Sequence, residues 1–223
     1  MSELLTPFKV IIYNIDRYSN AVCGRIFPQN FCYNNLSYKY TERNMFEKLR
    51  RMDTRVVERM SDIHRPVLDK IMVLFTYAGT GALIWWVLYV IPLLIARQFG
   101  RGIIMTTALG INYLLGEIII KRSVGRDRPS TQISSEDMKI NKPKDHSFPS
   151  GHSASSFCAF TVLLWTCPLW MWLPALALAC TIAFSRLYLR VHYLTDVMGG
   201  VLLGILDGTL INLFFQYFLF QPI

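Results

Sequence analysis

The stretch that decides the fold is His152–Ser185, HSASSFCAFTVLLWTCPLWMWLPALALACTIAFS, which carries no Asp, Glu, Lys or Arg over 34 residues. A single helix of that length would be about 50 Å long, whereas the hydrocarbon core of a bilayer is about 30 Å thick. Its middle, Trp165–Pro174, holds prolines, which interrupt helical hydrogen bonds, and tryptophans, which favour the membrane interface. The stretch is therefore predicted to form a tight helical hairpin that turns near Cys167 and Pro168.

The remaining apolar segments, read outward from this hairpin, also have the lengths of membrane spans. Ile71–Ala96 carries no charge over 26 residues, and Gly102–Ile120 has 19 residues with Glu117 near its end. Val197–Leu219 contains three glycines at four-residue intervals, a small-residue face that favours close helix packing. Since about 20 apolar residues cross the hydrocarbon core, the predicted fold class is all-α, a polytopic transmembrane helical bundle. Its five spans cover about 71–96, 102–120, 150–167, 169–187 and 197–219.

The N-terminal part of the chain has a different character. Residues 1–43 mix polar and aromatic residues without a clear period and are expected to form an arm or cap. Residues 44–70 carry an apolar stripe at helical spacing, with basic and acidic residues off the stripe. This pattern predicts an amphipathic helix, either at the membrane interface or packed on its own domain. The membrane-embedded domain would then be residues 71–219. The stripe consists of Met45, Leu49, Met52, Val56, Met60 and Ile63.

The composition excludes several classes of protein. Hydrophobic residues make up 52% and charged residues 17% of the 223 residues, and the mean hydropathy is +0.32, which is too apolar for an ordinary soluble domain. The net charge of +8 comes from Lys and Arg that flank apolar segments, which favours an anionic lipid surface over nucleic acid. The five cysteines form no CxxC pair, so no metal site is expected, and whether Cys23 and Cys32 pair is left open.

Three polar clusters interrupt the apolar sequence: Lys121–Pro129, Pro149–His152 and Ser185–Asp196. In a five-span topology, the end of the second span, the start of the third and the loop between the fourth and fifth all emerge on one side of the membrane. The clusters would then meet in one site. If His152–Ser185 were one straight helix, its ends would lie on opposite faces and no joint site could form.

The third cluster contains a histidine and a carboxylate at helical spacing. His192 and Asp196 are four residues apart, so on a helical turn the carboxylate can accept from Nδ1–H and leave Nε2 free to attack. Arg186 offers a planar fork that suits phosphoryl oxygens. Taken alone, this cluster could equally be a structural ion pair near a helix end.

The other two clusters are suited to holding an anion. Ser150 and Gly151 precede an apolar helix, whose free N–H groups and dipole favour negative charge, and His152 could donate a proton to a leaving oxygen. Lys121 ends the second span, and Arg128 precedes a proline that keeps its backbone extended, so both cations can reach the same anion. A helix cap and ordinary basic residues flanking a span are the structural alternatives.

These clusters read KxxxxxxRP, PSGH and SRxxxxxHxxxD in chain order. The pattern resembles the three-part signature of the type 2 phosphatidic acid phosphatase and vanadium haloperoxidase superfamily, over roughly residues 70–215. The resemblance implies a membrane phosphatase that needs no metal or other cofactor. It implies that His192 forms a phosphohistidine, that Asp196 supports His192, and that His152 protonates the leaving group. It assigns phosphate binding to Lys121, Arg128, Ser150, Gly151 and Arg186.

Three further charged residues lie beside the signature. Glu117 lies one helical turn before Lys121 within a span, which predicts either a carboxylate that holds Lys121 in place or a polar packing contact. Arg126 and Asp127, next to Arg128, are interpreted as no more than loop charges.

The expected substrates are lipid phosphate monoesters or diphosphates of the phosphatidate, phosphatidylglycerophosphate or polyprenyl diphosphate class. Undecaprenyl diphosphate alone, vanadate-dependent halogenation and a silent lipid-binding or transport role are the alternatives. If residues 1–70 do not cross the membrane, all Lys and Arg residues except Arg97 and Arg101 fall on the side of the site, and the positive-inside rule then places the site in the cytoplasm. The resemblance favours the outer face of the cell membrane, and the site is expected to face outward.

Overall fold

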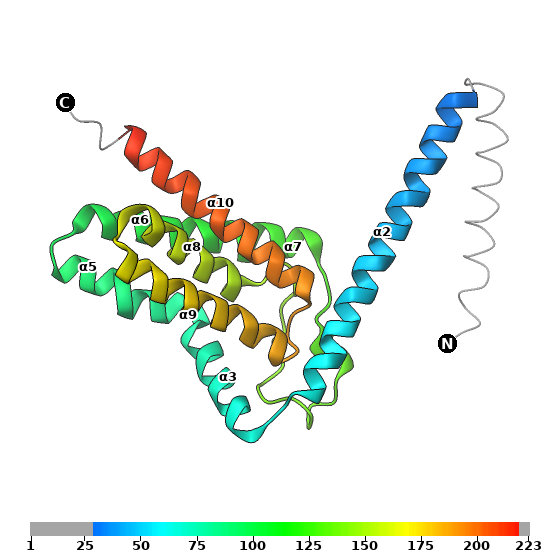
Figure 1. Ribbon diagram of the computed structural model, residues 1–223, viewed down its shortest axis with the longest axis horizontal. Helices are drawn as coiled ribbons and strands as arrows, with labels where there is room; N and C mark the ends of the chain where they lie inside the picture. The colour runs from blue at the N-terminus through cyan, green and yellow to red at the C-terminus, as the bar shows by residue number, and fades with distance from the viewer. Residues whose placement is uncertain (1–28, 219–223) are drawn as a thin grey trace. The chain divides into compact units, whose positions relative to one another are not determined.

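Helices account for all the regular structure in residues 29–218, the part of the chain that this computed structural model describes, with side chains from Met45 onward (Figure 1). The all-α prediction is therefore confirmed for these residues. The chain divides into two compact units, residues 1–51 and 52–223. Helix α2 (Gln29–Asp62) begins in the first unit and ends in the second. The predicted arm and Cys23 lie largely outside the described residues.

The predicted bounds of the amphipathic helix, residues 44–70, are wrong at both ends, since α2 already begins at Gln29. Instead of continuing to residue 70, α2 ends at Asp62, and α3 (Pro66–Ala78) starts after a short turn. Pro66 is the first residue of α3, where its missing N–H costs nothing and its fixed φ suits a helix start.

The predicted span 71–96 is also not one continuous helix. The chain bends by 61° between α3 and the segment Thr80–Ile95. Gly81 and Ala82 have φ values of 59° and 57°, in the left-handed region that a continuing α-helix cannot use. Hydropathy does not report backbone direction. The uncharged composition of residues 71–96 therefore predicted one span and gave no sign of the break. The second half consists of η1 (Thr80–Ala82), α4 (Leu83–Trp85), the π-helical η2 (Trp86–Val90) and α5 (Ile91–Ile95).

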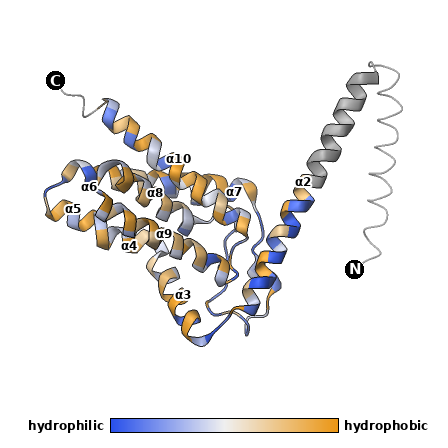
Figure 2. Ribbon diagram, in the orientation of Figure 1, coloured by the Kyte–Doolittle hydropathy of each residue, from blue (hydrophilic) through white to orange (hydrophobic). Residues whose placement is uncertain are grey.

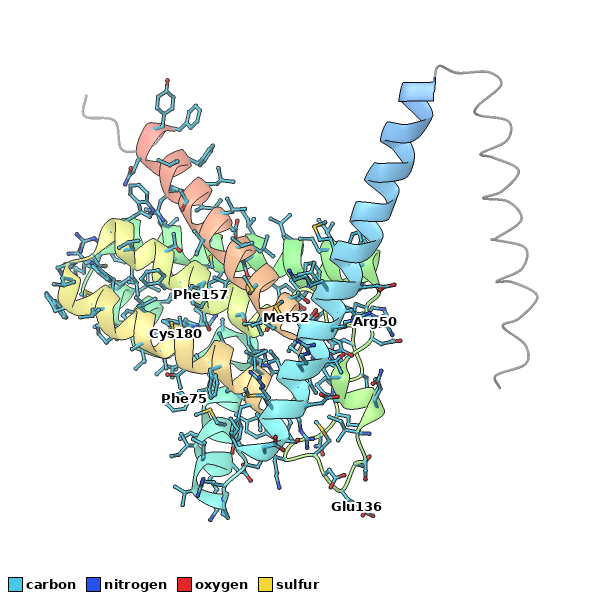
Figure 3. The ribbon with its side chains drawn as sticks, turned by 45° about the vertical axis from the view of Figure 1, so that its right-hand side comes forward. Arg50, Met52, Phe75, Glu136, Phe157 and Cys180 are labelled. Atoms are coloured by element: carbon cyan, nitrogen blue, oxygen red, sulfur yellow. The ribbon has the colours of Figure 1, made fainter. Side chains whose placement is uncertain are left out.

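The next segment is a continuous rod that carries the first polar cluster at its end. It consists of α6 (Phe99–Tyr113), the π-helical η3 (Leu114–Ile120) and α7 (Lys121–Val124), and it stops at Gly125, whose φ of 61° reverses the chain. A short 3-10 helix η4 (Pro129–Gln132) follows. The long connection after η4 includes Glu136 (Figure 3) and leads to α8.

The decisive uncharged stretch folds as a hairpin. α8 (Gly151–Thr166) and α9 (Leu169–Tyr188) are separated by Cys167 and Pro168, where the turn was expected. α10 (Leu194–Phe218) packs most extensively on α8. The core of the second unit is formed mainly by α6, α8, α9 and α10, and its fully buried side chains include Trp85, Met105 and Leu163.

Most residues of these helices are hydrophobic, as the largely orange ribbons in Figure 2 show, and many of their large apolar side chains are exposed. Three helices are long and apolar enough to cross a membrane: Phe99–Val124, Leu169–Tyr188 and Leu194–Phe218. The bent pair Pro66–Ile95 would be a fourth, whereas the 16 residues of α8 are fewer than a full span needs. Apolar side chains that face outward on α10 include Leu202, Leu206, Leu210, Leu213 and Phe214.

Candidate active site

The three polar clusters of the sequence meet around one cavity of about 660 Å³. Lys121 reaches it from the end of the α6–α7 rod, and Arg128 from the residue before η4. His152 comes from the first turn of α8, Arg186 from the last turn of α9, and His192 from the α9–α10 connection. Residues that are up to 71 positions apart in the chain therefore face the same space.

The lining of the cavity is partly polar and partly apolar. The cations and histidines belong to the polar part. The apolar part comes from the broken helix after α3, from the last turns of α6 and from α8. An anionic group with an apolar body would match this division, because each part would meet a wall of its own chemistry. The apolar part includes Ala82, Trp86, Leu109, Tyr113 and Ala154.

Arg128 is held by several contacts and is 3% exposed. Its Nη1 donates to the Val191 carbonyl at 3.0 Å and lies 2.8 Å from Nε2 of His192, and its Nη2 lies 3.0 Å from each carboxylate oxygen of Asp145. Burial lowers the pKa of Arg128, and the neighbouring Asp145 charge offsets this only in part. A guanidinium fixed in this way presents its N–H groups directly beside the histidine nitrogen.

Lys121 is paired with two carboxylates. Its Nζ lies 2.6 Å from Glu117 Oε2 and 2.5 Å from Asp145 Oδ2. The one-turn spacing of Glu117 and Lys121 thus places the two groups in contact, as the sequence indicated. Burial raises the pKa of Asp145, but the hydrogen bond from Lys121 and the charge of Arg128 outweigh it, so this pKa lies below its ordinary value.

The start of α8 forms the floor of the polar part. Ser150 caps the helix, with its Oγ 2.9 Å from Ser153 Oγ, and its own N–H donates to the Asp196 carbonyl at 3.0 Å. A Cβ on Gly151 would lie 2.0 Å from Glu117 Oε1. Only glycine therefore lets a carboxylate oxygen approach this helix start, where free N–H groups attract negative charge.

Arg186 approaches from the opposite wall and is also buried. Its Nη1 donates to Thr76 Oγ1 at 2.5 Å, and Thr76 Oγ1 lies 3.1 Å from Ser185 Oγ. Its Nε has no hydrogen-bond acceptor among the residues that the structure describes. Arg186 is thus a cation with a donor to spare at the edge of the cavity.

His152 is positioned by the break that follows α3. Its Nε2 lies 3.1 Å from the Thr76 carbonyl oxygen and 3.4 Å from Thr80 Oγ1. A Cβ on Gly79 would lie 2.9 Å from His152 Cδ2, so the glycine makes room for the ring. The bend that hydropathy missed therefore supplies the partners that the sequence could not identify for this histidine.

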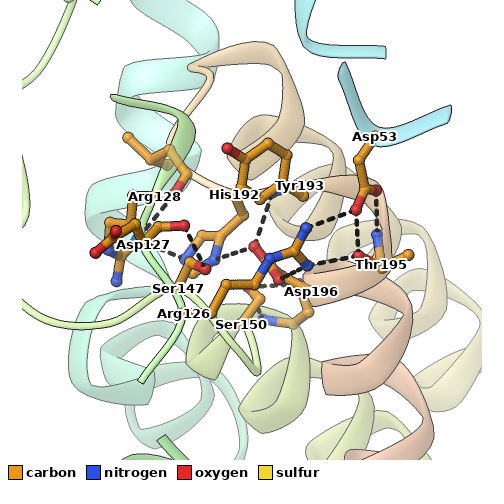
Figure 4. Close-up of polar contacts among 12 residues, drawn as sticks. Asp53, Arg126, Asp127, Arg128, Ser147, Ser150, His192, Tyr193, Thr195 and Asp196 are labelled. Atoms are coloured by element: carbon orange, nitrogen blue, oxygen red, sulfur yellow. Dashed lines mark hydrogen bonds and ion pairs between the residues drawn. The ribbon is translucent and has the colours of Figure 1, made fainter. Parts of the chain in front are cut away.

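His192 is 1% exposed and lies between a cation and a carboxylate, as Figure 4 shows. Its Nε2 faces Arg128, while its Nδ1 lies 3.7 Å from Asp196 Oδ2. That separation is longer than a hydrogen bond, so the expected Nδ1–Asp196 bond is not formed in this structure. Burial, and then the positive charges of Arg128, Arg186 and Lys121, hold the pKa of His192 well below its ordinary value.

The sequence that carries these features matches a known protein family. Residues 101–220, more than half of the chain, match the PAP2 superfamily. The chain belongs to the PAP2 superfamily. The family region includes every residue of the three clusters but excludes α2 and α3.

Named PAP2 relatives act on lipid phosphates. The chain is 32% identical over 121 residues to an undecaprenyl-diphosphatase of Sulfolobus acidocaldarius, an alignment that covers 54% of this chain and 58% of the relative. It is 28% identical over 158 residues to phosphatidylglycerophosphatase B of Bacillus subtilis, covering 65% and 73%. The crystal structure of a transmembrane PAP2-type phosphatidylglycerolphosphate phosphatase from Bacillus subtilis is similar, with a TM-score of 0.63 and 25% identity, covering 77% of this chain and 88% of that one.

The structure brings together all of the residues predicted for the PAP2 site. Ser150 and Asp196 lie directly behind the cavity wall and are fully buried, and the other predicted residues line the cavity. Among the described residues, no three His, Cys, Asp or Glu side chains converge as metal ligands. The predicted site residues that line the cavity wall are Glu117, Lys121, Arg128, Gly151, His152, Arg186 and His192.

Sequence reasoning missed several partners of these residues. Asp145 and Thr76 contact the cations, but both lie outside the signature spacing. The interpretation of Arg126 as a loop charge is wrong, because its guanidinium is bound to two buried carboxylates, Asp53 and Asp196. One signal was available for Asp53: it stands four residues after Leu49 in the apolar stripe, where a carboxylate needs a partner.

Proposed function

We propose that this chain is an integral membrane enzyme that hydrolyses lipid phosphate monoesters or diphosphates through a phosphohistidine. The proposal is carried by one observation: two histidines and three buried cations face a single cavity that is also lined by apolar side chains. The names of the relatives, which include lipid diphosphate and phosphatidylglycerophosphate phosphatases, support the same class of substrate.

The first step would be attack by His192 on phosphorus. Because its lowered pKa keeps the ring neutral, Nε2 has a lone pair at neutral pH. The Nε2–P bond forms as the P–O bond to the lipid breaks, and His152 gives a proton to the departing oxygen. Arg128, now 2.8 Å from Nε2, would turn its N–H groups to the phosphoryl oxygens as the substrate enters.

The second step would be hydrolysis of the phosphohistidine. His152, having lost its proton, takes one from an attacking water, and the P–N bond breaks to release inorganic phosphate and free His192. Lys121, Arg128 and Arg186, with the N-terminus of α8, would stabilise charge on the equatorial oxygens. This electrostatic task falls to Mg²⁺ in many phosphoryl-transfer enzymes.

The cavity is suited to a lipid because the bundle that encloses it has an apolar exterior. We propose that α8 and α9 act as two spans of a five-span domain, with the bent segment Pro66–Ile95 as the first. The proposal is supported by the common direction in which the α6–α7 rod, α9 and the start of α8 deliver their polar ends. The phosphate would then bind at the membrane interface while the chain of the lipid stays in the bilayer.

A phosphate-release assay tests this function. Purified enzyme in detergent is given phosphatidate, phosphatidylglycerophosphate, undecaprenyl diphosphate and a soluble sugar phosphate, with and without EDTA. We expect release from at least one lipid and undiminished rates with EDTA. His192→Ala should abolish release, and near-normal turnover by this variant would contradict the mechanism. The preferred substrate would identify the lipid class.

A further inference from the structure

A network of charged groups lies behind the pair His192 and Asp196, here called the dyad, on the side away from the cavity. At its centre is Arg126, whose Nη1 donates to Asp196 Oδ1 at 2.6 Å and to Thr195 Oγ1 at 2.7 Å. Its Nη2 donates to Asp53 Oδ2 at 2.7 Å. Figure 4 shows the guanidinium between the two carboxylates, and it also lies 4.2 Å from the centre of the Tyr193 ring.

Asp53 comes from α2 and is 2% exposed. Besides Arg126, it accepts hydrogen bonds from Thr195 N at 3.0 Å and from Thr195 Oγ1 at 2.6 Å. Thr195 belongs to the first turn of α10, so Asp53 supplies an acceptor for N–H groups that the helix itself cannot satisfy. Asp53 also lies outside residues 101–220, which match the family.

The two oxygens of Asp196 have different partners. Oδ1 is bound to Arg126, whereas Oδ2 accepts from the Tyr193 N–H at 2.8 Å and is the oxygen that lies 3.7 Å from His192 Nδ1. The bonds to Arg126 and to the Tyr193 N–H together fix the rotation of the carboxylate, and this rotation decides which oxygen faces the imidazole. Arg126 is the link between Asp53 and the dyad.

We propose that Asp53 and Arg126 are positioning residues that act on His192 through Asp196. The inference rests on the proposed function, since it concerns how the phosphorylated histidine is held. Asp53 anchors one arm of the guanidinium, and the other arm orients the carboxylate that stabilises positive charge on His192 during attack. The part of α2 that belongs to the second unit, residues 52–62, thus contributes to the positioning of the site.

The physical demand on this network is strict because both carboxylates are buried. A buried charge that loses its partner is strongly destabilised, and the planar fork of arginine is needed to bind two carboxylates at once. Lysine at position 126 would keep the charge but could not reproduce both arms of the fork. The two partners of Arg126 therefore depend on each other, and a change at Asp53 should alter the orientation of the Asp196 carboxylate.

A double-mutant cycle tests the proposal. The variants are Asp53→Asn, Asp196→Asn and the double variant, and the control is Glu58→Gln, which removes the same charge from an exposed position of α2. The readouts are kcat and KM for phosphate release in detergent. We expect Asp53→Asn to lower kcat about 10- to 100-fold, as for other partners that orient active-site groups, with KM within about 2-fold. Glu58→Gln should match the wild type.

The Asp196→Asn background separates a positioning role of Asp53 from a general effect of Asp53 on folding. If Asp53 acts through Asp196, then adding Asp53→Asn to Asp196→Asn should lower kcat by less than about 2-fold. An equal loss in both backgrounds, or a loss no larger than that of Glu58→Gln, would overturn the proposal. Should Asp53→Asn not accumulate as folded protein, the same cycle is run with Arg126→Lys, with the same two deciding outcomes.

The proposed function is judged separately in this experiment. Wild-type enzyme that releases no phosphate from any lipid would refute the function itself. Active wild-type enzyme with an unaltered Asp53→Asn variant would refute only the positioning role.

Discussion

At the scale of residues, two cations of the site are already paired with carboxylates. Lys121 is bound to Glu117 and Asp145, and Arg128 is bound to Asp145 through both carboxylate oxygens. These carboxylates hold the long basic side chains in place, which lowers the entropy that phosphate binding would otherwise cost. They also compete with phosphate for the same N–H groups. Asp145 is the more exposed of the two and lies on the loop before α8.

Removing the charge of Asp145 should therefore strengthen anion binding. We expect Asp145→Asn to lower the inhibition constant of inorganic phosphate several-fold, because a negative charge beside the incoming anion is lost. The measurement is product inhibition of phosphate release. Glu136→Gln, the same change at an exposed position of the same loop, should leave that constant unaltered. Weaker inhibition by phosphate in Asp145→Asn would show that Asp145 mainly orients the cations.

The protonation of His192 gives a prediction about pH. Burial and three nearby cations disfavour the imidazolium form, so the ring should lose its proton at a lower pH than the ordinary value of 6.5. The attacking neutral form is present above the lowered pKa and is lost as the pH falls through it. Nitrogen NMR of histidine-labelled enzyme in detergent, with His192→Gln for assignment, should show a neutral ring at about pH 6. A midpoint at or above 6.5 would contradict the electrostatic account.

At the scale of elements, the site depends on how closely α10 approaches α8. The predicted small-residue face of α10 is used for this contact. A Cβ on Gly204 would lie 2.3 Å from the Ala154 carbonyl oxygen, and one on Gly200 would lie 2.5 Å from the Ser150 carbonyl oxygen. Since α8 carries His152 and α10 carries Asp196, this contact sets the distance between two parts of the site.

Adding one methyl group at the helix contact should destabilise the fold. We expect Gly204→Ala to lower Tm, at a cost of about 1–3 kcal/mol, because the obstructing atom is backbone and cannot rotate away. Gly110→Ala in α6 is the matched control, since its Cβ would meet nothing within 4 Å. Alanine there should leave Tm equal or raise it slightly, because it favours the helix. The measurement is thermal unfolding in detergent, and equal Tm values for both variants would refute the packing argument.

At the scale of the whole molecule, charge and chemistry favour opposite orientations. In the proposed five-span topology, if residues 1–70 do not cross the membrane, nearly all Lys and Arg residues lie on the side of the site, which the positive-inside rule assigns to the cytoplasm. Several of these cations form the anion site, however, so their position is set by the reaction and not by insertion. We therefore expect the site to face outward from the cell membrane.

Cysteine labelling in sealed, right-side-out vesicles tests this orientation. An impermeant thiol reagent should label Glu136→Cys, on the loop before α8, and should not label Gln98→Cys, in the turn between α5 and α6. The parent protein, with its own cysteines, gives the background. The reverse pattern would place the site in the cytoplasm, and labelling of both positions would contradict the topology.

Several features of this protein could be predicted from the sequence because they depend on local composition. The uncharged length of His152–Ser185 exceeds one span, so a turn at Cys167 and Pro168 was required by the thickness of a bilayer. The spacing of Glu117 and Lys121 predicted their contact on one helical face. The spacing of His192 and Asp196 brought the two side chains close together, but His192 lies before α10 and the expected hydrogen bond is not formed. The order of the three clusters then predicted a common site.

Other features were decided only by the tertiary structure. The bend at Gly81 and Ala82 depends on backbone dihedrals that hydropathy does not report, yet it supplies the partners of His152. Asp53 and Arg126 are 73 residues apart, and a contact over such a distance has no periodicity to reveal it. The sequence by itself determined that the chain is an all-helical membrane protein and predicted the members of the candidate site, because both follow from composition and short spacing. The structure decided which groups orient them, because packing alone brings distant side chains together.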